Sequence, residues 1–357
     1  MQPAYDITRS YEENYADGPR IVPSAPRTPD PSVRRERFLG FEVNARIGIA
    51  AGPLLNSRWI AAYAQLGFDL PVYKTVRTRA VPSHLPPNCV LIDIAKPLCA
   101  DDFGRPLVVT TRQPESPAQV TITNSFGMPS RDPVVWQKDV AVAKQALTTG
   151  QILIVSVVGT PDDGGCTALA ADYARAAAMA REAGADAVEI NLSCPNVVSG
   201  EGSIFTDPAL SAQVSKTVKA AIGATPLIIK IGYIADAARL AAVARANAPH
   251  VSAISAINTL SFEVVGPDGG PALPGRLRSG VCGAAIRQCA MTQARRMVEI
   301  VQREKYDLAV IGVGGVMTAD HIRDYFNIGV DAVMSATGAM WDPHLAEKYL
   351  SRPASRY

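Results

Sequence analysis

The chain has 357 residues, of which 48% are hydrophobic and 19% charged, and its formal net charge is +2. This charge is too small for the basic face of a nucleic-acid-binding protein. No run of about 18 apolar residues predicts a membrane-spanning helix, and residues 1–18 lack the apolar stretch of a secretory signal. We therefore expect a cytoplasmic protein without a nucleic-acid or membrane partner.

The 6 cysteines include no pair with CxxC spacing, and no histidine lies at zinc-ligand spacing. In a chain of this length they are typical of reduced thiols. We expect no metal site.

Residues 1–36 are polar and contain six prolines. This composition predicts an N-terminal extension with little regular structure, although such an arm can still wrap around the protein or reach a partner. The remaining residues, 37–357, are predicted to form one catalytic domain.

From residue 38 onward, short apolar runs alternate with helical patterns. The runs are rich in Ala, Val, Ile and Leu, as parallel strands buried on both faces usually are. Eight predicted strands follow one another, at residues 46–52, 70–75, 152–158, 187–191, 227–230, 253–258, 308–312 and 332–335.

Helical patterns lie between these strands, at residues 168–183, 207–222, 284–304 and 318–327. The second of them begins with Asp207 and Pro208, residue types that helix starts prefer. Eight strand–helix units favour an α/β fold with a closed (β/α)₈ TIM barrel. An open doubly wound sheet is the alternative, and the absence of a GxGxxG motif before the first helix disfavours it.

The segment 77–144 is long for a connection between a strand and a helix, and it contains its own predicted strand at residues 119–123. Insertions that follow barrel strands build the active-site face. We therefore expect this insertion after the second strand to contribute to a site.

The most specific motif is Asn191-Leu-Ser-Cys-Pro-Asn196 at the end of the fourth predicted strand. Barrel enzymes place reactive groups at this end of their strands. Cys194 stands between two carboxamides, which both donate and accept hydrogen bonds. The side chains of Asn191 and Asn196, together with those of Asn124 and Asn258, are suited to bind a flat ring that is rich in N–H and C=O groups.

This motif resembles that of the dihydroorotate dehydrogenases, in which the fourth residue is the catalytic base, Cys in class 1 and Ser in class 2. The resemblance extends over roughly residues 38–345. Further segments similar to that family are Lys74-Thr75, Thr123-Asn-Ser-Phe-Gly-Met-Pro129, Lys230, Asn258-Thr259 and Gly312-Val-Gly-Gly-Val316.

The resemblance implies a class 1-like enzyme with Cys194 as its base and FMN as its cofactor. The implied substrate-binding residues are Lys74, Asn124, Gly127, Met128, Asn191, Asn196, Asn258 and Thr259. The implied cofactor-binding residues are Ala51, Gly52, Lys74, Thr75, Lys230, Gly283, Gly314, Gly315, Thr337 and Gly338. The glycines among the last group let backbone N–H groups approach a phosphate.

Some residues depart from the family pattern. Ser130 stands where class 1 enzymes often have Asn, and Phe126 and Met128 replace Met and Leu. Thr337 precedes Gly338, whereas in the family Gly precedes Thr. Cys282 lies close to the cofactor segment, and we interpret it as a packing residue.

The reaction that the resemblance implies is the oxidation of dihydroorotate to orotate in pyrimidine biosynthesis. The same resemblance implies a homodimer. Fumarate, or NAD through a separate electron-transfer subunit, is the acceptor in class 1, and the Cys base disfavours quinone. One alternative is a related FMN oxidoreductase that acts on another dihydropyrimidine or on a secondary-metabolite ring. Dihydropyrimidine dehydrogenases commonly have His where this chain has Asn196, which favours orotate. A non-catalytic FMN-binding barrel is the alternative of a different class.

Overall fold

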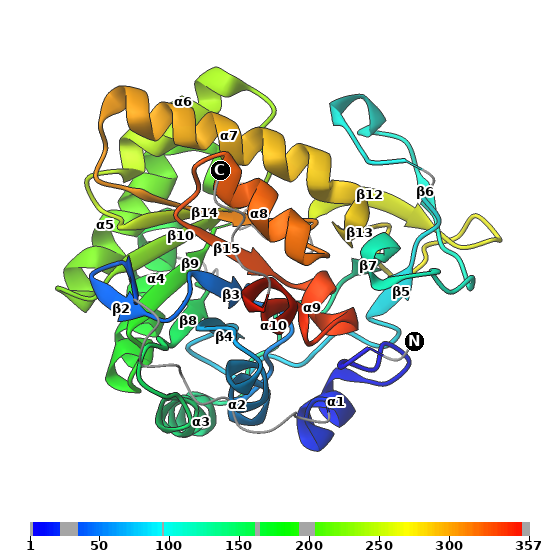
Figure 1. Ribbon diagram of the computed structural model, residues 1–357, viewed down its shortest axis with the longest axis horizontal. Helices are drawn as coiled ribbons and strands as arrows, with labels where there is room; N and C mark the ends of the chain where they lie inside the picture. Colours follow the sequence, from blue (N-terminus) through cyan, green and yellow to red (C-terminus); the bar gives the residue numbers. More distant parts are fainter. Residues whose placement is uncertain (1–2, 22–34, 95, 161–164, 193–203, 352–357) are drawn as a thin grey trace.

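The computed structural model describes residues 3–21, 35–94, 96–160, 165–192 and 204–351. Eight parallel strands form a closed barrel in the order β10-β11-β14-β15-β3-β4-β8-β9 (Figure 1). All eight predicted strands are confirmed. The barrel strands are β3 (Ile47–Ile49), β4 (Leu70–Val76), β8 (Ile154–Val157), β9 (Ala187–Asn191), β10 (Leu227–Ile231), β11 (Ala253–Ala256), β14 (Ala309–Val313) and β15 (Ala332–Ser335).

Helices surround the barrel, so the fold is the (β/α)₈ TIM barrel that the alternation predicted. They are α2 (Ser57–Gln65), α3 (Pro133–Gln145), α4 (Gly165–Glu182), α5 (Pro208–Ile222), α6 (Ala237–Asn247), α7 (Arg287–Glu304), α8 (Ala319–Asn327), α9 (Thr337–Trp341) and α10 (Leu345–Leu350). The cap predicted for α5 is present, because the Asp207 side chain accepts hydrogen bonds from the N–H groups of Ala209 and Leu210.

Two hydrophobic clusters hold the barrel together. One fills its interior and includes Leu70, Ile154, Ile228 and Met334. It also includes residues of the hairpin β1 (Glu36–Phe38) and β2 (Phe41–Val43), which packs against this interior. The other cluster lies between the strands and the surrounding helices.

A second sheet is built from two insertions, in the order β5-β7-β13-β12-β6. Strands β5 (Cys89–Leu91), β6 (Leu107–Val108) and β7 (Thr121–Asn124) belong to the predicted insertion after β4. Strands β12 (Leu260–Val265) and β13 (Arg278–Gly283) follow β11 and were not predicted. Figure 1 shows this sheet grouped on one side of the barrel. Three 3₁₀ helices complete the insertions, η1 (Ala100–Asp102), η2 (Pro117–Gln119) and η4 (Ala284–Ile286).

The N-terminal extension, for which little regular structure was expected, contains one short helix among its described residues, α1 (Tyr11–Asp17). Ser10 and Glu13 cap the helix reciprocally through a capping box, a local signal that the proline count obscured. The division of the chain at residue 36 stays a prediction.

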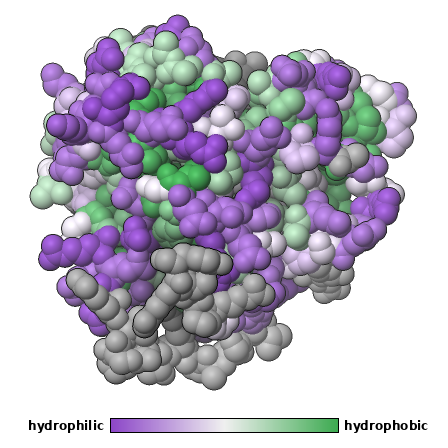
Figure 2. All heavy atoms as spheres, turned by 45° about the horizontal axis from the view of Figure 1, so that its top comes forward, coloured by the Kyte–Doolittle hydropathy of each residue, from purple (hydrophilic) through white to green (hydrophobic). Residues whose placement is uncertain are grey.

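Within the described ranges, every helix is too short or too polar to cross a bilayer. On the face seen in Figure 2, hydrophilic residues predominate and hydrophobic areas are small.

Candidate active site

One pocket lies at the carboxyl ends of the barrel strands, under the second sheet. Its empty volume is about 1180 Å³, including its open mouth, which suits a cofactor together with a small molecule. Residues from the ends of β4, β9 and β10 and from the loops after β3, β11, β14 and β15 line it. This is the end of a TIM barrel at which catalytic residues are found.

Almost all described residues that the sequence assigned to a site line this pocket. They are Ala51, Gly52, Lys74, Thr75, Asn124, Met128, Asn191, Lys230, Asn258, Thr259, Gly283, Gly314, Gly315, Thr337 and Gly338. Gly127 belongs to the same loop as Met128 but is not among the lining residues. A Cβ atom on Gly127 would lie 2.5 Å from the His84 ring, so its small size serves packing against that ring. Cys194 and Asn196 lie outside the described residues.

Three carboxamides come together in the pocket. Asn258 Nδ2 donates to Asn191 Oδ1 over 3.3 Å, and Asn258 Oδ1 accepts from the Thr259 N–H over 2.9 Å. Asn124 enters from β7 in the second sheet. The buried hydroxyl of Thr259 has no hydrogen-bond partner among the residues that the structure describes. A buried polar group without a partner is costly, which points to a bound molecule as its partner.

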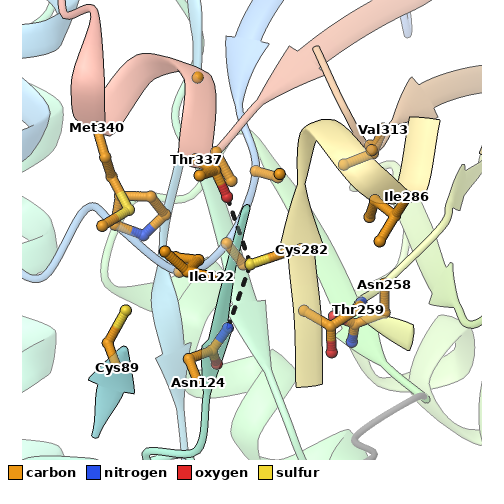
Figure 3. Close-up of a pocket in the computed structure, with 18 of the residues that line it drawn as sticks. Cys89, Ile122, Asn124, Asn258, Thr259, Cys282, Ile286, Val313, Thr337 and Met340 are labelled. Atoms are coloured by element: carbon orange, nitrogen blue, oxygen red, sulfur yellow. Dashed lines mark hydrogen bonds between the residues drawn. The ribbon is translucent and has the colours of Figure 1, made fainter. Parts of the chain in front are cut away.

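Two thiols that the sequence analysis did not assign to the site also line it. Cys282 accepts from Asn124 Nδ2 and from Thr337 Oγ1, each over 3.4 Å, and so lies between a strand of the second sheet and α9 (Figure 3). Cys89 enters from β5. Burial raises the pKa of both thiols, so they stay protonated at neutral pH. The interpretation of Cys282 as mere packing was therefore incomplete.

Two lysines supply positive charge to the pocket. Both are at least nine-tenths buried, with exposed fractions of 9% for Lys74 and 3% for Lys230. Lys230 Nζ donates to the Ala51 carbonyl over 3.4 Å, and Lys74 Nζ lies 6.0 Å from the centre of the Phe126 ring. Each lies near the carboxyl end of its strand, Lys74 two residues before the end of β4 and Lys230 one residue before the end of β10, and both line the pocket.

Glu189 is a buried charge beneath this pocket that the sequence analysis missed. It precedes Asn191 by two residues on β9, and alternate residues of a strand share a face. Its side chain is fully buried, and neither carboxylate oxygen has a well-formed hydrogen bond among the described residues, although the Ser156 side chain lies close enough to favour the charged form. Burial raises the pKa of Glu189, and the nearby charge of Lys230 opposes that rise.

This raised pKa predicts a pH-dependent contribution to stability. The folded protein binds the Glu189 proton more tightly than the unfolded chain does, so the contribution is full below the ordinary pKa of 4.5 and is lost as pH rises through the raised value. We expect the free energy of unfolding of the wild type to fall relative to Glu189→Gln between about pH 4 and neutrality. Denaturant titrations at several pH values measure this difference.

The exposed Glu299 provides a control for the titration. Glu299→Gln removes a carboxylate from the surface of α7 and should follow the wild-type profile. If the free energy of unfolding of the wild type and of Glu189→Gln changed in parallel with pH, the pKa of Glu189 would not be raised in the folded protein.

The departures from the family pattern face the pocket except at Ser130, and the reversed pair Thr337 and Gly338 is among those that do. Phe126 and Met128 line it. Ser130 is absent from the lining, and its Oγ accepts from the Arg77 N–H over 3.0 Å and donates to the Arg131 carbonyl over 2.9 Å. Ser130 thus fixes the backbone behind the loop.

Comparisons with known proteins agree with this geometry. A sequence profile described as Dihydroorotate dehydrogenase matches residues 104–351. A protein of Dictyostelium discoideum named Dihydroorotate dehydrogenase is 39% identical over 360 residues, which cover 98% of this chain and 96% of that protein.

Two bacterial relatives match over shorter stretches. Both are named Dihydroorotate dehydrogenase B (NAD(+)), catalytic subunit. The protein of Desulforudis audaxviator is 32% identical over 57% of this chain and 64% of its own length. The protein of Staphylococcus carnosus is 30% identical over 46% of this chain and 51% of its own length.

Proposed function

Since the chain belongs to the dihydroorotate dehydrogenase family, we propose that it oxidises dihydroorotate to orotate in pyrimidine biosynthesis, with FMN bound in the barrel pocket. Membership of this family makes the chain an oxidoreductase acting on CH–CH donors. The observation that carries the proposal is the convergence in one pocket of three asparagines, two lysines and the glycines after β14 and β15.

The residues present fit FMN. Gly314 and Gly315 both have positive φ, of 118° and 64°. A Cβ atom on Gly315 would lie 2.3 Å from Arg287 Cβ, and one on Gly338 would lie 2.1 Å from the Val316 carbonyl oxygen. The bare backbone of these two loops, with the Thr337 hydroxyl, would hold the phosphate, as the corresponding loops of TIM barrels do.

The flavin ring would meet the rest of the cofactor set, which is Ala51, Gly52, Lys74, Thr75, Lys230 and Gly283. The positive charge of Lys230 would stabilise the negative charge that the flavin ring gains on reduction. When bound, FMN supplies the acceptor for the hydride that leaves C6 of dihydroorotate.

The chain's own residues would hold the ring and take its proton. Oxidation makes C5 and C6 of the ring doubly bonded, so C5 must lose a proton as C6 loses a hydride. We assign this proton to the Cys194 thiolate, the reactive form of a cysteine. Asn124, Asn191 and Asn258 would pair with the ring N–H and C=O groups, together with Asn196 and the Thr259 hydroxyl.

Removing a carboxamide from the pocket should weaken substrate binding. Asn124→Ala and Asn258→Ala each leave a ring atom without its partner, at a cost of roughly 1–3 kcal/mol. We expect the dissociation constant for orotate to rise by about 5-fold or more while FMN stays bound. Titration of the FMN-loaded protein with orotate measures it.

Asn44 provides the matched control, since its Nδ2 donates to the Thr149 carbonyl and it lies outside the pocket. Asn44→Ala should leave orotate binding unchanged. Wild-type affinity in both Asn124→Ala and Asn258→Ala would mean that the pocket holds a different ring.

We further propose a cytoplasmic homodimer, on the family resemblance alone. The acceptor that reoxidises the flavin is fumarate, or NAD through a separate subunit. Relatives named catalytic subunits of an NAD(+) enzyme support the second choice, but they match only 46% and 57% of this chain.

A further inference from the structure

The N-terminal segment, residues 3–21, is folded back onto itself and tied to the end of the barrel. The Arg20 N–H donates to the Ala4 carbonyl over 2.9 Å, and the Ala4 N–H donates to the Met340 carbonyl over 2.7 Å. Arg20 also pairs with Asp6 over 2.6 Å, and Asn14 Oδ1 accepts from the Asp6 N–H over 2.8 Å. The two ends of the segment are thereby joined next to α9, whose first residues line the pocket.

Helix α1 within this segment is fastened to the start of α2. The Arg58 guanidinium donates to the carbonyls of Tyr15 and Ala16 over 2.7 and 2.6 Å, and Asn56 Nδ2 donates to the Tyr15 carbonyl over 2.9 Å. The Arg131 guanidinium lies over the Tyr15 ring at 4.4 Å. These contacts fix the position of the segment relative to the barrel.

Two tyrosines of the segment, Tyr5 and Tyr11, line the pocket. Both rings meet Phe126 edge-on, with centroid distances of 5.8 Å and 6.2 Å. Phe126 follows Asn124 by two residues and lies against the Lys74 ammonium group. The segment therefore forms a wall of the pocket behind the loop that follows Asn124.

The Tyr5 hydroxyl is the unsatisfied group in this wall. Only 3% of the residue is exposed, and its oxygen is buried without a hydrogen-bond partner in the described part of the chain. Burial raises the pKa of Tyr5, so the hydroxyl keeps its proton and remains a donor. A buried donor without an acceptor is costly, and such groups in folded proteins are normally satisfied by a partner.

We propose that Tyr5 is a ligand-binding residue of the pocket, whose hydroxyl donates a hydrogen bond to a carbonyl oxygen or ring nitrogen of a planar heterocycle. The inference rests on the proposed function, under which two such rings enter the pocket, the flavin and the pyrimidine. Both carry acceptors of this kind, and separate binding measurements distinguish them.

The test is Tyr5→Phe, which removes the hydroxyl and keeps the ring. One arm titrates flavin-free protein with FMN, and the other titrates FMN-loaded protein with orotate. We expect one of the two dissociation constants to rise by about 3- to 10-fold. The melting temperature of the flavin-free protein should hold or rise, because the variant buries no unpaired hydroxyl.

Tyr15→Phe is the matched control, since it removes a hydroxyl from the same segment outside the pocket lining. It should leave both dissociation constants unchanged. Wild-type affinity for both ligands in Tyr5→Phe would overturn the proposal. A wild type that binds FMN but not orotate would contradict the proposed function, and the FMN arm alone would then decide the role of Tyr5. A wild type that binds neither ligand would overturn both.

Discussion

Replacing Cys194 with alanine is expected to slow the reduction of bound FMN by dihydroorotate by roughly 10²-fold or more. The reason is that no other residue of the Asn191–Asn196 motif readily accepts a proton from carbon. Flavin binding should not change, because Cys194 is not assigned to the cofactor. The measurement is the anaerobic rate at which the visible absorption of oxidised flavin disappears.

Cys194→Ser refines this test. A serine hydroxyl is far less acidic than a thiol, so the variant should be slow near neutral pH and recover as pH rises. Cys166 is exposed, and Cys166→Ala should match the wild type. If Cys194→Ala reduced its flavin at the wild-type rate, Cys194 would not be the base.

Replacing Lys230 with methionine is expected to have the second large effect. The Lys230 residue is only 3% exposed, and a buried positive charge stabilises developing negative charge strongly. Loss of such a group costs roughly 10²–10³ in rate in comparable sites. The same anaerobic assay measures it, with flavin content determined separately.

Lys230→Met also removes the cation near Glu189, so it should destabilise the fold as well. The double variant Lys230→Met with Glu189→Gln separates the two effects. It should recover stability, because no unpaired carboxylate remains buried, and it should stay slow. Recovery of the rate in the double variant would contradict the role given to Lys230.

The barrel could be predicted from the sequence because its signals are local. The ranges of β9 and β15 match the predicted apolar runs, and the Asp207 cap marks the start of α5. Helix α3 carried the same signal in Asp132 and Pro133 but lay within the long insertion, where its weak amphipathic pattern did not stand out.

The second sheet could not be predicted in this way because its pairings are distant in sequence. Strand β13 pairs with β7 across more than 150 residues, as in the Asn124 and Gly280 register. No strand was predicted at residues 278–283, and their extended form depends on this pairing. Position in that sheet is also what brings Cys89 and Cys282 to the pocket.

Two further site residues were missed in the sequence, and only one of them could have been found from a local pattern. Glu189 is the one charged residue of the otherwise uncharged strand Ala187–Asn191, two residues before a predicted ligand, so alternation could have found it. Tyr5 left no such signal, because its place in the pocket depends on the contacts of residues 3–21 with α2 and α9.

Oxidation of dihydroorotate in this pocket is tested most directly by one measurement. Purified FMN-loaded protein is mixed anaerobically with dihydroorotate, and in parallel with dihydrouracil, while the flavin absorption is followed. We predict that dihydroorotate bleaches the flavin and that dihydrouracil does so far more slowly. A flavin that stays oxidised with dihydroorotate, or that is bleached by dihydrouracil alone, would contradict the account.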